Sequence, residues 1–182
     1  RLKMVRTRCP LITLIFLLGI TAPVAGQEIK RSAYHDYRIE TVVEGLQQPW
    51  SIAFLPDGDM LVTEKPGRLR IVRNGILLPD PVAGIPAVQS GGQAGLLDVV
   101  PHPDFASNRL LYLSYSKPSD NSESTTAVIR GRFENGELTN REEIFLAVSQ
   151  GRGHYGSRLA FDKEKYLFIT VGDRQAPPRG DL

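Results

Sequence analysis

The sequence of 182 residues predicts an all-β fold. Short runs of alternating or β-branched apolar residues recur along the chain, separated by turn signals such as Pro-Asp-Gly and Asn-Gly. A pattern of strand, turn and strand is repeated three times. No stretch has the apolar periodicity of an amphipathic helix of several turns. We therefore expect a chain built from antiparallel sheets.

The expected strands follow one another through most of the chain. In order, they span residues 37–43, 51–55, 60–64, 68–73, 96–100, 110–116, 125–133, 143–148, 159–161 and 166–171. The dipeptides Asn74-Gly75 and Asn135-Gly136 predict hairpin turns, because asparagine and glycine tolerate a positive φ. Residues 79–92 are rich in proline and glycine and are expected to form a loop.

The repeated unit indicates a β-propeller. Its copies begin at Trp50, Gly95 and Gly156, and further strands after the first two copies suggest four strands per unit. Units of this length and strand number are typical of propeller blades. A β-sandwich or a Greek-key barrel would give similar strands but not the recurring start. Because the third copy stops after about two strands, we expect an N-terminal fragment that covers roughly two and a half blades of a longer protein.

The first 26 residues have the pattern of a secretory signal peptide. A basic start precedes an apolar run at 11–20, and small residues follow it. Met4 is the expected true start, and cleavage is expected after Ala25 or Gly26. The apolar run is too short to span a bilayer permanently. The sequence therefore predicts a periplasmic or secreted protein with no membrane anchor after cleavage.

Residues 27–36 are expected to be a linker, and residues 37–182 the truncated propeller domain. Cys9, the only cysteine, would leave with the signal peptide. From Gln27 onward, 18 basic and 20 acidic residues give a formal charge of −2. This slightly acidic body, without a basic cluster, argues against nucleic-acid binding.

A candidate general-base pair lies at the two ends of the third copy. His154 stands in a glycine-rich loop before its first strand, and Asp173 follows its second strand. If the two strands form a hairpin, both side chains lie on the same edge of the sheet. A carboxylate that orients an imidazole makes a general base. The alternative is that the two residues are polar loop residues that never meet.

Three sequence blocks resemble the soluble glucose/sorbosone dehydrogenase family. They are LPDGDMLVTEKPGRLRIV (55–72), GGQAGLLDVVPHPDF (91–105) and GHYGSRLAFDKEKYLFITVGDR (153–174). The likeness covers roughly residues 37–174 and is closest to periplasmic aldose sugar dehydrogenases that use pyrroloquinoline quinone. It implies a six-bladed β-propeller with the quinone over the channel mouth. The implied reaction oxidises the anomeric hydroxyl of an aldose to the lactone, with hydride transfer to the quinone and an external electron acceptor.

The resemblance also implies roles for individual residues. His154 would take the proton of the anomeric hydroxyl and contact the cofactor, and Asp173 would hydrogen-bond its imidazole. Gln93 matches a glutamine that contacts both cofactor and substrate. The imidazole must be neutral, and an ordinary histidine pKa of about 6.5 suits that role near neutral pH. The calcium ligands and the basic residues for the quinone carboxylates come from later blades, so we expect no metal ligand here and an inactive fragment.

Two other functions remain open on the sequence. One is a non-catalytic extracellular binding propeller of the same fold. The other is a propeller lactonase, which would need a carboxylate-rich calcium centre that the sequence does not show. The joint occurrence of His154, Asp173 and Gln93 favours the enzyme, because a binding module needs no base with an orienting partner. Neither the preferred sugar, the electron acceptor nor the oligomeric state follows from the sequence.

Four further residues are expected to have structural roles. Arg158 and Arg174 could be cofactor contacts, but they are interpreted as members of ion pairs that hold the loops. His102, in a Pro-His-Pro-Asp turn, is interpreted as a turn residue, and Trp50 as a packing residue rather than a platform for a sugar.

Overall fold

The computed structural model describes residues 28–119 and 123–175, and divides the chain into the units Arg1–Glu40 and Thr41–Leu182. In the first unit, strands β1 (Lys30–Arg31) and β2 (Asp36–Tyr37) form a short antiparallel hairpin. The expected linker thus includes a pair of very short strands. The predicted signal peptide and its cleavage site lie outside the described residues.

The strand predicted at 37–43 is wrong. Strand β2 ends at Tyr37, and residues 38–48 form no strand. Two apolar side chains of this stretch remain largely in solvent, since Ile39 is 64% and Val42 61% exposed. Alternating hydrophobicity makes a strand only where a neighbouring strand supplies hydrogen bonds and a face to pack on.

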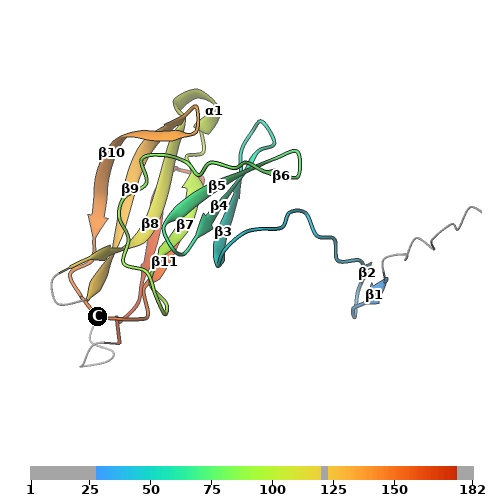
Figure 1. Ribbon diagram of the computed structural model, residues 1–182. Helices are drawn as coiled ribbons and strands as arrows, with labels where there is room; N and C mark the ends of the chain where they lie inside the picture. The colour runs from blue at the N-terminus through green and yellow to red at the C-terminus, as the bar shows by residue number, and fades with distance from the viewer. Residues whose placement is uncertain (1–27, 120–122, 176–182) are drawn as a thin grey trace, which may run out of the picture. The chain divides into compact units, whose positions relative to one another are not determined.

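Three antiparallel sheets make up the described part of the second unit (Figure 1). The first has the order β3 (Pro49–Phe54), β4 (Met60–Glu64), β5 (Arg68–Arg73) and β6 (Ile76–Leu77). The second contains β7 (Leu96–Pro101), β8 (Leu110–Pro118), β9 (Ser124–Glu134) and β10 (Glu137–Leu146). The third pairs β11 (Gly156–Phe161) with β12 (Leu167–Val171). Each sheet follows the chain order, which is the meander expected of a propeller blade.

Both predicted asparagine-glycine turns are confirmed. The φ angles are 51° at Asn74 and 75° at Gly75, and 50° and 77° at Asn135 and Gly136. Two successive positive φ values give the turn twist that matches adjacent strands. Because the second turn leads directly into β10, that strand begins at Glu137 rather than at residue 143 as predicted.

One helix of four residues, α1 (Phe105–Asn108), connects β7 to β8. It follows the Pro-His-Pro-Asp stretch, where the sequence predicted a break in the strand. Within residues 28–119 and 123–175, the structure has no helix with the length and apolar character needed to cross a membrane.

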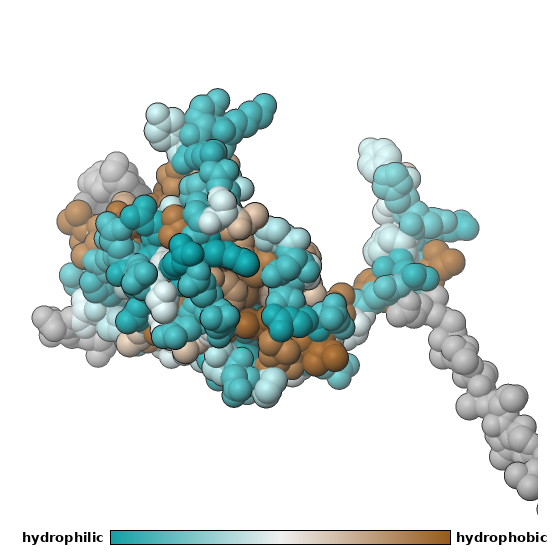
Figure 2. Space-filling view, turned by 90° about the horizontal axis from the view of Figure 1, so that it is seen from above, coloured by the Kyte–Doolittle hydropathy of each residue, from teal (hydrophilic) through white to brown (hydrophobic). Residues whose placement is uncertain are grey.

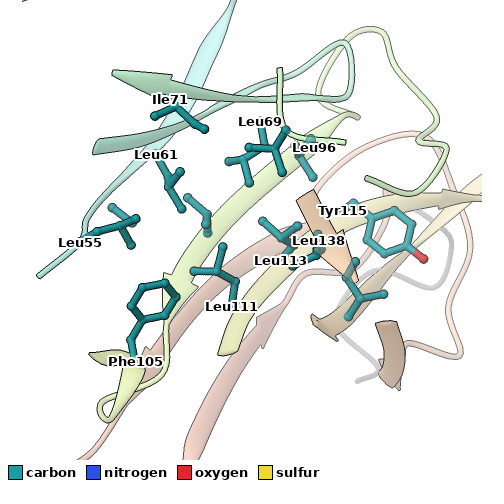
Figure 3. Packing of buried hydrophobic residues seen from close by; sticks show 14 of the residues in the cluster. Leu55, Leu61, Leu69, Ile71, Leu96, Phe105, Leu111, Leu113, Tyr115 and Leu138 are labelled. Atoms are coloured by element: carbon teal, nitrogen blue, oxygen red, sulfur yellow. The ribbon is translucent and has the colours of Figure 1, made fainter. Parts of the chain in front are cut away.

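The main core lies between the first two sheets. Figure 3 shows leucines of both sheets pointing toward one another, among them Leu61 and Leu69 opposite Leu96, Leu111 and Leu113. These five side chains are fully buried. Each contributes roughly 1.5–3 kcal/mol by its removal from water. This shared core fixes the first sheet against the second.

The first strands of the three sheets are neighbours, with β7 in contact with both β3 and β11. A buried carboxylate, Asp98 on β7, joins them. It accepts hydrogen bonds from Ser51 Oγ on β3 at 2.5 Å and from Leu159 N on β11 at 2.8 Å. Asp98 also accepts a hydrogen bond from Arg158 Nη1 at 3.0 Å. The sheets are therefore tied together along their first strands, as consecutive blades are around a propeller axis.

Apolar side chains also reach the surface of the second unit, and some are visible in Figure 2. Phe54 on β3 is 69% exposed and Phe168 on β12 is 60% exposed. Exposed residues alternate with less exposed ones along both strands, so the first and third sheets each leave apolar residues uncovered.

Candidate functional site

The loops on either side of the third sheet approach each other closely. Strands β11 and β12 pair antiparallel with Gly156 opposite Val171, so the loop before β11 and the loop after β12 meet at one edge. A Cβ atom on Gly172 would lie 2.2 Å from the carbonyl oxygen of His154, and one on Gly151 would lie 2.2 Å from that of Arg174. Only glycine permits such contacts between backbones. Glycines in both loops therefore allow the close approach that forms the site.

His154 and Asp173 meet at this edge. The Nδ1 atom of His154 lies 2.6 Å from Oδ1 of Asp173, and the same oxygen accepts the backbone N–H of Gln175 at 3.0 Å. An ionised carboxylate only accepts hydrogen bonds, so it selects the tautomer with a proton on Nδ1. The Nε2 atom then carries a lone pair. The histidine side chain is 46% exposed.

Two glutamines complete the surroundings of His154. The Oε1 atom of Gln93 accepts the backbone N–H of His154 at 2.8 Å. The Nε2 atom of Gln175 lies 3.0 Å from the imidazole Nε2 and donates to its lone pair in the tautomer that Asp173 selects. Gln93 thus supports the histidine through its backbone, and Gln175 covers the nitrogen that would act as a base.

A pocket of about 320 Å³ opens beside these residues. The first strand of each sheet contributes one residue to it, namely Trp50, Leu97 and Gly156. The remaining lining residues come from loops, namely Lys65, Gly92, Gln93, His154 and Tyr155. The pocket therefore lies at the end of the inner strands, where the mouth of a propeller channel is expected.

The pocket combines three kinds of polar group. His154 offers a lone pair, Gln93 an amide that both donates and accepts, and Lys65 a positive charge. The ammonium of Lys65 donates to the carbonyl of Gly92, on the same rim. Such a set can hold a ligand with hydroxyl, carbonyl and anionic groups and remove a proton from it.

Arg174 lies directly behind His154. It is 1% exposed, and burial lowers the pKa of its guanidinium from the usual value. It donates to the carbonyl oxygens of Gly153, His154, Tyr155 and Gly172. The sequence predicted that Arg174 holds loops as an ion pair. It does hold them, but its hydrogen bonds go to backbone carbonyls.

The other structural interpretations agree with the contacts. Arg158 forms the expected ion pair, with Asp98, and its guanidinium lies 4.9 Å above the Trp50 ring. His102 Nδ1 accepts the backbone N–H of Asp104 at 3.0 Å, as a turn residue would. Trp50 packs against the cluster of Ala94, Leu97 and Tyr155, as expected, but it also lines the pocket.

Sequence reasoning missed three residues, Lys65, Asp98 and Gln175. Lys65 and Asp98 lie near the site only because one sheet packs against another, which the sequence does not show. Gln175 had a usable signal, because it follows Asp173 by two residues beyond the same strand. No group of three His, Cys, Asp or Glu side chains within the described ranges could hold a metal ion.

A comparison with family models identifies the relatives of this chain. The model described as glucose / sorbosone dehydrogenase matches residues 46–181. The chain belongs to this family. The resemblance drawn from the three sequence blocks is therefore confirmed.

Individual relatives of this glucose / sorbosone dehydrogenase chain support the same assignment. It is 42% identical to aldose sugar dehydrogenase YliI of Escherichia coli over 151 residues, which are 79% of this chain and 40% of the relative. The crystal structure of the soluble aldose sugar dehydrogenase from E. coli in the apo-form superposes with a TM-score of 0.73 at 41% identity, covering 79% of this chain and 43% of that one.

A further structure is that of aldose sugar dehydrogenase from Streptomyces coelicolor in its PQQ-bound form. It shares 26% identity at a TM-score of 0.68, over 85% of this chain and 45% of that one. The glucose / sorbosone dehydrogenase chain thus spans about two fifths of the length of these relatives. The predicted all-β propeller architecture is confirmed by these structures and by the order of the three sheets.

Proposed function

We propose that the complete protein in which these residues occur is a quinone-dependent aldose sugar dehydrogenase. The observation that carries the proposal is the His154–Asp173 pair at 2.6 Å on the rim of a pocket that Gln93 also lines. The proposed reaction converts the anomeric hydroxyl of an aldose to a lactone. A non-catalytic binding propeller would use the same fold but has no need of an oriented base.

Pyrroloquinoline quinone is the proposed cofactor, as in the structure of the S. coelicolor relative. The pocket residues suit it: the Lys65 ammonium is a partner for a carboxylate, and the Gln93 amide is a partner for a quinone carbonyl or a sugar hydroxyl. When bound, the quinone supplies the two-electron acceptor for the hydride of the anomeric carbon.

His154 is the proposed general base. Its Nε2 lone pair would take the hydroxyl proton as the anomeric C–H bond breaks, and Asp173 would stabilise the imidazolium through Nδ1. Gln175 donates to Nε2 in this structure, so its amide must leave that nitrogen before a sugar hydroxyl can approach. Gln93 would hold the sugar or cofactor while it keeps the backbone of His154 in place.

Calcium is the second proposed cofactor, and the described residues do not make a site for it. Its ligands are proposed to lie elsewhere in the complete protein, and no step is derived through it. The proposed location is periplasmic or extracellular, after removal of the signal peptide. There the partners would be an aldose and an external electron acceptor.

The test is reconstitution of the complete protein with the quinone and calcium, followed by dye-linked oxidation of an aldose panel. We expect oxidation only when the quinone is present, with the lactone as product. An aldose that binds without being oxidised, in protein shown to hold the quinone, would contradict the enzyme and favour the binding propeller.

A further inference from the structure

Arg174 is the largest fully buried side chain of the described residues. Removal of a positive charge from water is costly unless hydrogen bonds replace its hydration. The contacts of the guanidinium therefore indicate what the arginine does.

The guanidinium donates hydrogen bonds to the backbone carbonyls of His154 and of the residues on both sides of it. Its Nη1 atom donates to the carbonyl of His154 and, at 3.4 Å, to that of Gly153. Its Nη2 atom donates to the carbonyls of Tyr155 at 3.0 Å and Gly172 at 3.1 Å. Three consecutive carbonyls before β11 and one carbonyl after β12 thus converge on a single cation.

An aromatic ring also holds the guanidinium. The guanidinium carbon lies 5.0 Å from the centre of the Tyr155 ring, in a cation–π contact. Tyr155 is itself buried, and its hydroxyl lies 2.6 Å from Ser124 Oγ on β9. Through Tyr155, Arg174 is therefore connected to the second sheet, and its hydrogen bonds connect the loop of the third sheet to the same point.

This loop needs such support because its backbone is strained. His154 has a φ of 44°, a left-handed conformation that costs a residue with a side chain about 1 kcal/mol or more. The imidazole is 46% exposed, so side-chain packing restrains it little. The hydrogen bond to Asp173 selects the tautomer, but the position of the ring depends on the backbone that carries it.

We propose that Arg174 is the positioning residue of the site: it fixes the backbone of His154 so that Nδ1 meets Asp173 and Nε2 keeps its lone pair. Arg174 touches no reacting atom in this arrangement and acts only through His154. The inference rests on the proposed function, in which His154 is the base. It assigns the loss of catalysis in Arg174 variants to a misplaced imidazole rather than to a lost cofactor contact.

The experiment compares Arg174→Met, Arg174→Lys and, as a matched control, Arg152→Met in the complete protein. Arg152 is an exposed arginine of the same loop. Nitrogen-15 NMR of the histidine rings reports the tautomer directly, with His154→Gln to assign the signal. Steady-state kinetics of the quinone-loaded protein then separate kcat from KM. Thermal melts of each variant determine a temperature at which all the variants are folded, and every spectrum is recorded at that temperature.

We expect His154 of the unmodified protein to carry its proton on Nδ1, and Arg174→Met to give a mixture of tautomers. We expect kcat to fall by roughly 100-fold, the effect of a displacement of about 1 Å, with KM changed less than about threefold. Arg174→Lys keeps the charge but has too few donors for four carbonyls, so both effects should be intermediate. Arg152→Met should change neither.

An unchanged His154 signal in both Arg174 variants would overturn the positioning role, whatever the activity. Should Arg174→Met not fold, the same criterion applies to Arg174→Lys. A shifted His154 signal in protein that oxidises no aldose even without substitution would contradict the proposed function and leave the positioning role standing. The two inferences therefore fail in distinguishable ways.

Discussion

His154 and Asp173 are joined by a hydrogen bond of 2.6 Å between Nδ1 and Oδ1, although a whole hairpin separates them in the sequence. The contact exists because β11 and β12 return the chain to the same edge and because Gly172 lets the two loops touch. The carboxylate decides which imidazole nitrogen has a lone pair. That choice determines whether the histidine can act as a base toward the pocket.

Asp173→Asn tests the tautomer. An asparagine amide can donate to Nδ1, which would move the imidazole proton to Nε2 and remove the base. We expect kcat for aldose oxidation to fall by roughly 10²–10⁴-fold, the usual contribution of a general base. Asp104→Asn is the control, because Asp104 is an exposed aspartate that pairs with Lys165. Equal activity of Asp173→Asn and this control would contradict the orienting role.

Gln175→Ala tests whether the amide competes with the substrate for Nε2. A neutral hydrogen bond contributes about 1 kcal/mol, so its removal should lower KM by up to about fivefold. The value of kcat should stay within about threefold, because the amide has left Nε2 before the proton moves. A kcat reduced 100-fold would show instead that Gln175 takes part in the reaction. Measurement of the sugar concentration dependence distinguishes the two.

Asp98→Ala tests the tie between the three sheets. The variant leaves Ser51 Oγ, Leu159 N and the guanidinium of Arg158 without their acceptor. Ser51 and the backbone N–H of Leu159 are buried donors, and a buried donor left without an acceptor costs about 1–3 kcal/mol, so we expect a loss of about that size in the free energy of unfolding. Urea titration of the complete protein measures it. A loss below about 1 kcal/mol would mean that the sheets do not depend on this carboxylate.

The fully buried Glu64 predicts a pH-dependent part of the stability. Burial, the largest effect, raises its pKa, but hydrogen bonds from Arg68 and Gln47 N and the charges of Arg68 and Arg70 outweigh it and lower the pKa below the ordinary value of 4.5. A carboxyl group with a depressed folded-state pKa stabilises the protein above its unfolded pKa, and this stability is lost as the pH falls through the folded value.

Glu64→Gln should therefore destabilise the protein at pH 7, and the difference from the unmodified protein should shrink as the pH falls below about 4.5. Urea midpoints at several pH values check this. A stability difference that stays constant over that pH range would contradict the lowered pKa of Glu64. The difference would then come from packing rather than from the charge of the carboxylate.

Local features of the fold could be predicted from the sequence, and features that depend on contacts between sheets could not. Asn74-Gly75 and Asn135-Gly136 carry their own turn preference, so both hairpins follow from two residues each. The same logic brings His154 and Asp173 together, because one hairpin joins them. The stretch at 37–43 has the alternation of a strand but, beyond Tyr37, no partner strand among the described residues, and the sequence does not reveal that a partner is missing.

The rest of the site depends on the packing of one sheet on another. Asp98 meets Arg158 across 60 positions of the sequence, and Lys65 reaches the pocket from the β4–β5 turn. Arg174 could be recognised as a loop residue, but its burial follows from the Tyr155 ring and the carbonyls around it. No spacing rule contains that information, since it arises from the relative placement of blades.

The most direct test of the account is the turnover of His154→Ala in the complete protein loaded with quinone and calcium. We expect kcat for aldose oxidation to fall by roughly 10²–10⁴-fold, the contribution of a general base. Quinone binding, followed by its absorbance, should persist, because Lys65 and Gln93 remain in the pocket. Full turnover by this variant with bound quinone would contradict the claim that His154 is the base.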